Sequence, residues 1–354
     1  MDRYPIPSPS VLREVIRKDK PPAPLTAMFH ITEHCNVRCE FCWHHSFLRK
    51  DRLVPHKMDT TSVVELIEDL AAMGTTDITL SANGEPTLHP GFPAMVETAK
   101  KNNMRIKTVT NLTIVTPAII SALSRTDLLV INLAAVNQES YQAIYAPLGK
   151  VSFAQLLENI KVLSALGKRG PELKLGYVIT KNNYRNVRDA LKIAEDCGIP
   201  SIRFKIMDPS PFTEPLILND EEKLWLSKEI LTLNKIPTVI SSNLSDILTM
   251  ISPTRGGQKN GAQEVEHGRC FVGWFVMDIN ENGQITLCCQ NDKLVIGNWK
   301  EQKLKDIWEG EKAQEFRNTT KTRIDFDHPL YHACRGCFYS NPKHYTRQIN
   351  QPVN

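Results

Sequence analysis

Three cysteines near the amino end of the chain have a spacing that suits metal binding. Three residues separate Cys35 from Cys39, two separate Cys39 from Cys42, and an apolar run over residues 25–31 comes just before them. Four-iron clusters usually take four thiolate ligands, so three from one short loop would leave one iron free to bind another group. A zinc loop or reduced structural thiols are the alternatives, but zinc loops more often pair C-x2-C with a distant second pair.

A second group of cysteines lies near the carboxyl end. Its members are Cys270, Cys288, Cys289, Cys334 and Cys337. Residues 275–280 and 284–288 are typical of a β-hairpin that turns at Asn282-Gly283, and a helix is expected over residues 304–317. The C-x2-C pair at the end suits a four-cysteine zinc site as well as an iron–sulfur cluster, so the residues alone leave both open.

The elements that must position the first cysteines alternate between strands and helices. Short apolar runs predict strands at residues 27–31, 77–80, 105–109, 128–133, 173–179 and 201–207. Amphipathic stretches predict helices at residues 61–73, 93–102, 117–123, 140–144, 153–166 and 187–196. This alternation predicts an α/β fold whose parallel sheet is curled into a barrel or partial barrel.

Polar residues follow most of these strands. In parallel α/β sheets the reactive site lies beyond the carboxyl ends of the strands. The residues found there are Gly84, Glu85, Pro86, Asn111, Asn132, Thr180, Lys181, Lys205 and Asp208. Each is a candidate for binding a cofactor or substrate, although any of the polar side chains could instead cap a strand by bonding loop backbone.

The composition of the chain bears on whether it binds nucleic acid or a membrane. The chain has 354 residues, a net charge of +4 and 23% charged residues, and its basic residues are scattered in pairs rather than gathered on a face. A nucleic-acid partner is therefore not expected. The amino terminus has no apolar signal core and no stretch approaches a membrane span, so the nine cysteines point to a reducing cytoplasm and to metal rather than disulfides.

The first cysteine triplet, with Phe41 before its last member, resembles the signature of the radical S-adenosylmethionine (SAM) enzymes. The segment Gly84-Glu85-Pro86 resembles that family's Gly-Gly-Glu-Pro motif, with Asn83 at the first glycine. The resemblance implies a [4Fe–4S] cluster on the triplet, with SAM chelating the open iron and its ammonium group bound by the Gly-Glu-Pro segment. Reductive cleavage of SAM would then give a 5′-deoxyadenosyl radical that abstracts hydrogen from the substrate.

The same resemblance implies a partial (β/α)6 barrel. Phe41 is then expected to shield the cluster from water. Asn111, Asn132, Thr180 and Lys181 become candidates for the methionine carboxylate and the ribose of SAM, with Lys205 and Asp208 as candidate substrate contacts.

The carboxyl-terminal cysteines resemble the cluster-binding domains called SPASM and Twitch. Because no cysteine follows Cys337, the Twitch arrangement with one auxiliary [4Fe–4S] cluster is expected. Its ligands would be Cys270, Cys288, Cys334 and Cys337. Four protein ligands would saturate this cluster, which favours electron transfer over substrate binding. Cys197 is expected to be a core thiol, whereas Cys289 is a candidate hydrogen donor to a substrate radical, or could replace Cys288 as the cluster ligand.

The expected organisation has five parts. They are an amino-terminal extension (1–24), the radical SAM partial barrel (25–211), a bridging helix and loop (212–265), the SPASM/Twitch domain (266–340) and a tail (341–354).

The expected activity is hydrogen abstraction from a small polar substrate, such as a sugar, an aminocyclitol or a nucleoside sugar. Dehydrogenation, epimerisation or decarboxylation would follow, in natural-product biosynthesis. An electron donor of the flavodoxin or ferredoxin type is implied, and a membrane partner is not expected. Twenty-four residues are too few for a peptide-leader-binding domain, which favours a small substrate. Modification of a ribosomally made peptide and a non-catalytic maturation role are the alternatives.

Overall fold

The computed structural model describes residues 14, 21, 23–50, 54–146, 152–236, 238–251, 267–288, 291, 293–322, 324–325, 327–331 and 334. Cys289, Cys337, the loop 255–261 and the tail 341–354 lie outside these residues.

Most of the described strands belong to one sheet. Their bounds are β1 Thr26–His30, β2 Asp77–Ser81, β3 Arg105–Thr110, β4 Leu128–Asn132, β5 Glu172–Ile179, β6 Ser201–Ile206, β7 Ser241–Ser242, β8 His267–Gly268, β9 Val276–Ile279, β10 Gln284–Thr286, β11 Val295–Asn298 and β12 Ile324–Asp325. Ten of them form a sheet in the order β11-β10-β9-β1-β2-β3-β4-β5-β6-β7, and β12 pairs with β8.

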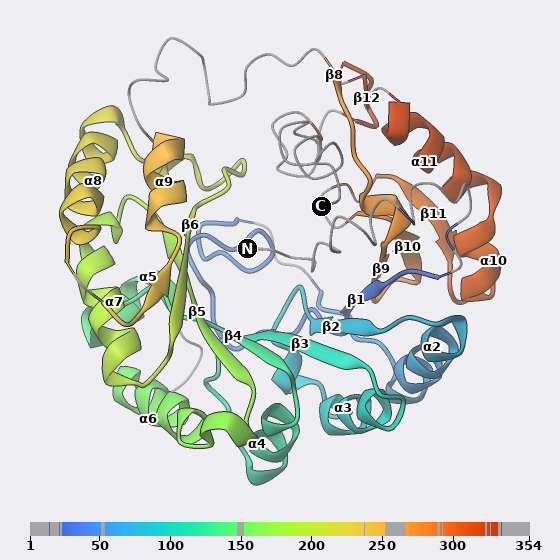
Figure 1. Ribbon diagram of the computed structural model, residues 1–354, viewed down its shortest axis with the longest axis horizontal. Coiled ribbons are helices and arrows are strands. Elements are labelled where there is room, and N and C mark those ends of the chain that lie inside the picture. Colours follow the sequence, from blue (N-terminus) through green and yellow to red (C-terminus); the bar gives the residue numbers. More distant parts are fainter. Residues whose placement is uncertain are drawn as a thin grey trace, which may run out of the picture.

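Helices cover the outer side of this sheet. Their bounds are α2 Thr60–Met73, α3 Phe92–Lys101, α4 Pro117–Ser124, α5 Gln138–Tyr145, α6 Phe153–Ser164, α7 Val187–Asp196, α8 Asp220–Leu233, α9 Leu244–Ile251, α10 Leu304–Glu309 and α11 Glu311–Thr322. Figure 1 shows the strands following an arc, with α2, α3, α4, α6 and α7 outside it and the blue segment that follows β1 inside.

The strands β1 to β6 confirm the predicted partial barrel. Consecutive strands pair in parallel along the whole series. Each predicted strand is present within one residue at each end, and each predicted helix of the barrel within two. Because all carboxyl ends of a parallel sheet lie at one edge, the polar residues that follow these strands are gathered at that edge.

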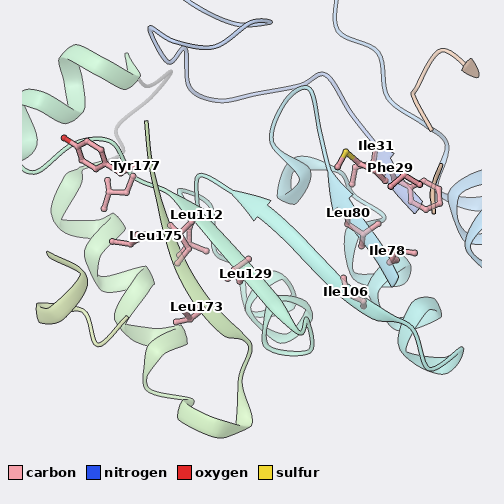
Figure 2. Packing of buried hydrophobic residues seen from close by; sticks show 14 of the residues in the cluster. Phe29, Ile31, Ile78, Leu80, Ile106, Leu112, Leu129, Leu173, Leu175 and Tyr177 are labelled. Carbon is pink, nitrogen blue, oxygen red and sulfur yellow. The ribbon is translucent and has the colours of Figure 1, made fainter. Parts of the chain in front are cut away.

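The hydrophobic core fills the space between the sheet and the outer helices. Register places Phe29 beside Leu80, and Leu129 beside Leu173, so that these buried side chains lie on one face. Figure 2 shows the cluster to which they belong. Side chains alternate between the two faces of a strand, so the residues between them face the inside of the arc.

The sheet continues from the barrel into the carboxyl-terminal part of the chain. Strand β9 pairs with β1 in parallel, with Ala27 beside Met277 and Phe29 beside Ile279. β9 and β10 pair antiparallel, as expected for the predicted hairpin, and β10 also pairs antiparallel with β11. The local sequence pattern predicts the hairpin, but it carries no information about which strand edge receives β9.

The expected helix over residues 304–317 is two helices. α10 ends at Glu309 and α11 begins at Glu311, because Gly310 has an extended backbone (ψ 165°) that interrupts the helical hydrogen bonds. Both helices bury large side chains, among them Trp308 and Phe316. The indole nitrogen of Trp308 donates to the Pro21 carbonyl at 2.7 Å, which links α10 to the segment just before β1.

Among the residues that the structure describes, none of the helices combines the length and the apolar character that crossing a membrane requires.

The hairpin turn makes a testable prediction. Gly283 has φ +96°, and a Cβ there would lie 2.4 Å from the Asn298 side-chain oxygen, whereas Gly167 has φ +54° with nothing within 4 Å of the same position. We expect Gly167→Ala to lower the unfolding free energy by about 1 kcal/mol, the backbone cost alone, and Gly283→Ala by about 2–3 kcal/mol. Thermal melts of the two variants at equal iron content check this, and equal shifts would contradict the crowding at the turn.

Candidate metal centre

The cysteine triplet lies in the loop that directly follows β1. Backbone hydrogen bonds hold this loop to the carboxyl end of α5, from Arg38 N to the Tyr145 oxygen and from Glu40 N to the Ile144 oxygen, both at 2.8 Å. The amide of Cys42 donates to the Cys39 carbonyl at 3.0 Å, which folds the loop into a turn. The loop therefore presents its three thiols from a fixed backbone rather than from a mobile one.

The three thiols of the triplet are free to bind metal. Cys35, Cys39 and Cys42 form no disulfide with one another, and burial raises the pKa of Cys35 to about 12 and the pKa of Cys39 well above its usual value. Metal binding would replace these protons. Within the described ranges no three His, Cys, Asp or Glu side chains converge on one ion. In a four-iron cluster each thiolate binds a different iron, so its ligands need no such convergence.

Phe41 lies against the helix that supports the loop. Its ring meets the Tyr145 ring edge-on, with centroids 6.0 Å apart, and the Tyr145 hydroxyl accepts a hydrogen bond from Ala134 N at 2.6 Å. This packing fixes the side chain beside the last cysteine. Its role as a water shield for a cluster stays a prediction.

Gly84 lies in backbone contact with the cysteine loop. Its amide donates to the Thr32 oxygen at 3.0 Å, and the amide of Glu85 donates to the His34 oxygen at 2.7 Å. A Cβ on Gly84 would lie only 2.1 Å from the His34 oxygen. Only glycine permits this approach, which joins the segment after β2 to the residue just before Cys35. Pro86 then begins a 3-10 turn over Pro86–Leu88.

The Glu85 carboxylate joins the ends of β2 and β3. It accepts hydrogen bonds from the amide and hydroxyl of Thr87, from the hydroxyl of Thr110 at 2.6 Å and from the amide of Asn111 at 2.7 Å. Burial raises its pKa despite these four donors. With both oxygens engaged, Glu85 shapes the loop that would surround SAM. A direct contact to SAM stays a prediction.

Asn111 contacts the cysteine loop through another asparagine. Its amide nitrogen donates to the Asn36 side-chain oxygen at 3.0 Å, and both side chains also bond Thr113. Asn36 follows Cys35, so this network ties the end of β3 to the first cysteine. The sequence correctly predicts that Asn111 lies at the carboxyl edge of the sheet, but it does not reveal that Asn36 is its hydrogen-bond partner.

Glu40 is a site residue that the sequence analysis missed. It lies between Cys39 and Phe41, is 2% exposed, and accepts hydrogen bonds at 2.7 Å from the Thr180 hydroxyl and the Asn182 amide. Thr180 was expected to contact SAM, but the partner that the structure gives its hydroxyl is this carboxylate. An acidic residue inside a short cysteine motif is the signal that could have indicated Glu40.

Lys181 and Asn132 lie at the same edge of the sheet. The Lys181 ammonium is 3.8 Å from the Glu222 carboxylate at the start of α8, and its side chain is 47% exposed. Asn132 ends β4, where register places it beside Gly176, which lies between Asn132 and Arg203 on the inner face. A contact of either residue with SAM stays a prediction.

The inner face of the sheet carries polar side chains among apolar ones such as Val109, Val130 and Val178. Positions that alternate with the buried core residues include Lys107, Asn132, Arg203 and Lys205, and all four are partly exposed. The ammonium of Lys205 pairs with the Asp208 carboxylate. Charged side chains in the middle of a sheet are expensive to bury unless they face water or a polar ligand, so this face is suited to a polar molecule.

A histidine and a carboxylate meet where β1 adjoins β9. His30 Nε2 lies 3.2 Å from both Asp278 carboxylate oxygens, and register puts both residues on the inner face. Close by, the Asn83 amide contacts the Glu281 carboxylate at 3.4 Å. These residues come from strands far apart in the sequence, and only the unpredicted pairing of β9 with β1 brings them together.

The second cysteine set is partly described. Cys270 and Cys288 are buried, and Cys334 is partly exposed. The amide of Cys270 donates to the Thr320 oxygen on α11 at 2.8 Å, and the amide of Cys334 donates to the Tyr331 oxygen at 2.9 Å. Cys337, expected as the fourth ligand, and Cys289, the candidate hydrogen donor, lie outside the described residues. Cys197 is buried in the barrel core, as expected.

The close approach of Gly84 makes a second prediction. We expect Gly84→Ala to displace the cysteine loop and to lower iron bound by the triplet at least fivefold, since the added methyl meets backbone that cannot rotate away. Gly91→Ala is the matched control, because its Cβ would meet the side chain of Thr60 at the start of α2 instead. Iron analysis after anaerobic reconstitution, in a background lacking Cys270 and Cys288, checks the difference. Equal iron in the two variants would contradict it.

Two family models match the chain. Residues 29–194 match the Radical SAM superfamily, and residues 270–338 match SPASM, an iron–sulfur cluster-binding domain. The first range holds the cysteine triplet and all the cofactor-binding candidates, and the second holds the five carboxyl-terminal cysteines.

Known relatives agree with this assignment. A tungsten-containing aldehyde ferredoxin oxidoreductase cofactor-modifying protein of Pyrococcus furiosus is 22% identical over 342 residues, which cover 87% of this chain and 85% of the relative. An S-adenosylmethionine-dependent nucleotide dehydratase of Lacinutrix mariniflava is 28% identical over 166 residues, 45% of this chain and 33% of the relative. The chain thus matches the second relative over about a third of its length.

The fold is also that of a solved SAM-bound protein. The crystal structure of Streptococcus suis SuiB bound to S-adenosylmethionine superposes with a TM-score of 0.64 at 15% identity, covering 92% of this chain and 76% of SuiB. With the two family matches, residues 29–194 are identified as a radical SAM domain and residues 270–338 as a SPASM-type iron–sulfur cluster-binding domain.

Proposed function

We propose that this radical SAM enzyme abstracts a hydrogen atom from a small polar substrate, a sugar, aminocyclitol or nucleoside sugar, bound against the inner face of the barrel. The observation that carries the proposal is the set of polar side chains on the inner face, where Lys107, Asn132, Arg203 and Lys205 alternate with the buried core residues. Polar and charged side chains at these positions can bind a polar substrate, whereas an apolar substrate would remove part of their surface from water at a cost in free energy. The nucleotide dehydratase, a relative named for a small polar substrate, supports the same reading.

The residues that would hold the cofactors follow from the site. Cys35, Cys39 and Cys42 would ligate the SAM-binding cluster, with the segment Gly84-Glu85-Pro86 against the methionine end of SAM. When bound, the cluster and SAM together supply a one-electron cleavage that yields a 5′-deoxyadenosyl radical. The protein's contribution is to orient SAM and the substrate and to exclude water and oxygen.

We favour dehydrogenation as the outcome. Removing a hydrogen atom, then a proton and an electron, oxidises a substrate C–H group by two electrons. The electron acceptor would be the auxiliary cluster, saturated by Cys270, Cys288, Cys334 and Cys337. The proton acceptor would be His30, which Asp278 orients at 3.2 Å and which keeps 17% of its side chain exposed.

Peptide modification is the second candidate. SuiB, which shares the fold, has also been crystallised bound to the precursor peptide SuiA. At 14% identity this similarity shows the fold alone, so the peptide hypothesis ranks second.

An experiment with cell extract separates the two candidates. We expect the fraction below 1 kDa to raise 5′-deoxyadenosine formation by the reduced enzyme, and protease treatment of the extract to leave the increase unchanged. Liquid chromatography of deoxyadenosine measures the effect. An increase that protease abolishes would contradict the small substrate and favour a peptide.

The cysteine assignment makes a prediction about iron. The reconstituted protein should hold about eight irons per chain, two clusters of four. Replacing Cys35, Cys39 and Cys42 by Ala should leave about four irons and reduce deoxyadenosine formation below detection, since SAM loses its open iron. Cys197→Ala removes a buried thiol outside both sets and should change neither quantity. Zinc in place of iron, or deoxyadenosine formation that survives the triple replacement, would contradict the assignment.

The fate of the substrate radical can be read from deuterium. In a dehydrogenase, turnover in deuterated water leaves the product carbon unlabelled, because no hydrogen returns to it. An epimerase that uses Cys289 as donor would place one deuterium on that carbon, and Cys289→Ala would stop turnover while deoxyadenosine still formed. Mass spectrometry of the product distinguishes the outcomes, and a labelled product would contradict dehydrogenation.

A further inference from the structure

Glu40 lies within the cysteine triplet and bonds three different parts of the chain. Its amide donates to the Ile144 oxygen on α5 at 2.8 Å, and its carbonyl accepts from the Ser46 hydroxyl, later in the same loop, at 2.6 Å. One carboxylate oxygen accepts from the Thr180 hydroxyl and the other from the Asn182 side-chain amide, both at 2.7 Å. Every polar atom of Glu40 therefore has a partner, and its carboxylate is the part that reaches the end of β5.

The turn that receives this carboxylate is itself fixed by hydrogen bonds. Thr180 is fully buried, and its amide donates to the Asn183 side-chain oxygen at 2.8 Å. The Asn183 side-chain amide donates in turn to the Ala134 oxygen, just after β4, at 2.9 Å. The Tyr177 hydroxyl, from within β5, donates to the Asn183 backbone oxygen at 3.1 Å. Because the barrel holds this turn in place, the Glu40 carboxylate can locate the cysteine loop against the sheet.

The backbone of Glu40 is continuous with that of two expected metal ligands. Glu40 immediately follows Cys39, and Cys42 lies two residues further on. The amide of Cys42 donates to the Cys39 carbonyl at 3.0 Å, so the three residues belong to one hydrogen-bonded turn. A movement of Glu40 away from β5 would therefore carry Cys39 and Cys42 with it.

We propose that Glu40 is a positioning residue that holds the cysteine triplet in register with the ends of β4 and β5, so that SAM can bind the cluster and this edge of the sheet together. The proposal rests on the ligand set Cys35, Cys39 and Cys42 of the proposed function. Three thiolates can still bind iron on a slightly displaced loop, because the metal–sulfur bonds are strong. A ligand that bridges two elements is more sensitive, since its partners must be held within about 0.5 Å of the productive geometry.

The test uses the full chain in the background lacking Cys270 and Cys288, so that only the cluster on the triplet is observed. Glu40→Ala removes the carboxylate, Glu40→Gln keeps its length and one oxygen without the charge, and Thr180→Val combined with Asn182→Ala removes its two partners. Iron content is measured after anaerobic reconstitution. SAM binding is measured as the SAM concentration that produces half of the change in the electron paramagnetic resonance spectrum of the reduced cluster.

Asp127→Ala is the matched control. The Asp127 carboxylate also joins neighbouring strands, since it accepts from Ile106 N on β3 at 2.7 Å. It directly precedes β4 and so lies at the opposite edge of the sheet from the triplet. We expect this variant to melt at a lower temperature while its iron content and SAM binding stay unchanged, which separates general destabilisation from loss of register.

We expect Glu40→Ala to keep its iron and to raise the half-maximal SAM concentration about tenfold or more, as is typical when the support of a metal ligand is lost. The combined replacement of Thr180 and Asn182 should have a similar effect. Adding Glu40→Ala to that combination should change SAM binding no further, because the carboxylate then has no partners to lose. Glu40→Gln should fall between Glu40→Ala and the parent.

SAM binding by Glu40→Ala equal to that of the control would overturn the positioning role, and so would loss of its iron. Additive effects of Glu40→Ala and the partner replacements would also overturn it, because the carboxylate would then act on SAM or the cluster without Thr180 and Asn182. If Glu40→Ala fails to fold, Glu40→Gln and the partner replacements decide. Absence of iron from the parent protein of this series would instead contradict the ligand set, and with it the proposed function.

Discussion

The site depends on a backbone contact between two loops. The segment after β2 lies against the residues that lead into the cysteine triplet, with hydrogen bonds from Gly84 N to Thr32 O and from Glu85 N to His34 O. The contact leaves no room for a side chain at Gly84. Whatever the triplet binds is thus held in register with the Gly-Glu-Pro segment, and this register is the condition for one molecule of SAM to touch both.

Buried polar side chains extend that constraint around the barrel. Glu85 ties β2 to β3, Asn111 ties β3 to Asn36 in the cysteine loop, and Glu40 in the same loop reaches the end of β5. Each of these buried side chains has hydrogen-bond partners, so the network makes the loop more rigid and does not destabilise it. The inner face then offers polar side chains beside a fixed cofactor site, while β9 on the edge of β1 brings the SPASM-type domain alongside.

Structure could be predicted from the sequence where local pattern decides it. Apolar periodicity located the six strands and the helices between them, and cysteine spacing with the Gly-Glu-Pro segment located the site edge. Contacts between distant residues were not predictable. Glu40 and Thr180 are 140 residues apart, and His30 and Asp278 are 248 apart, so neither pair has a local signal. Gly310 divides an expected helix into two. The break was not predicted because the residues on both sides of Gly310 have a helical pattern.

The central claim is that the triplet leaves one iron open for SAM. It is tested most directly by electron–nuclear double resonance on the reduced protein, in a variant lacking Cys270 and Cys288, with SAM labelled by nitrogen-15 at its amino group. The account predicts a nitrogen-15 coupling to the cluster that disappears with unlabelled SAM. A reduced cluster whose spectrum shows no coupling to the label would contradict it.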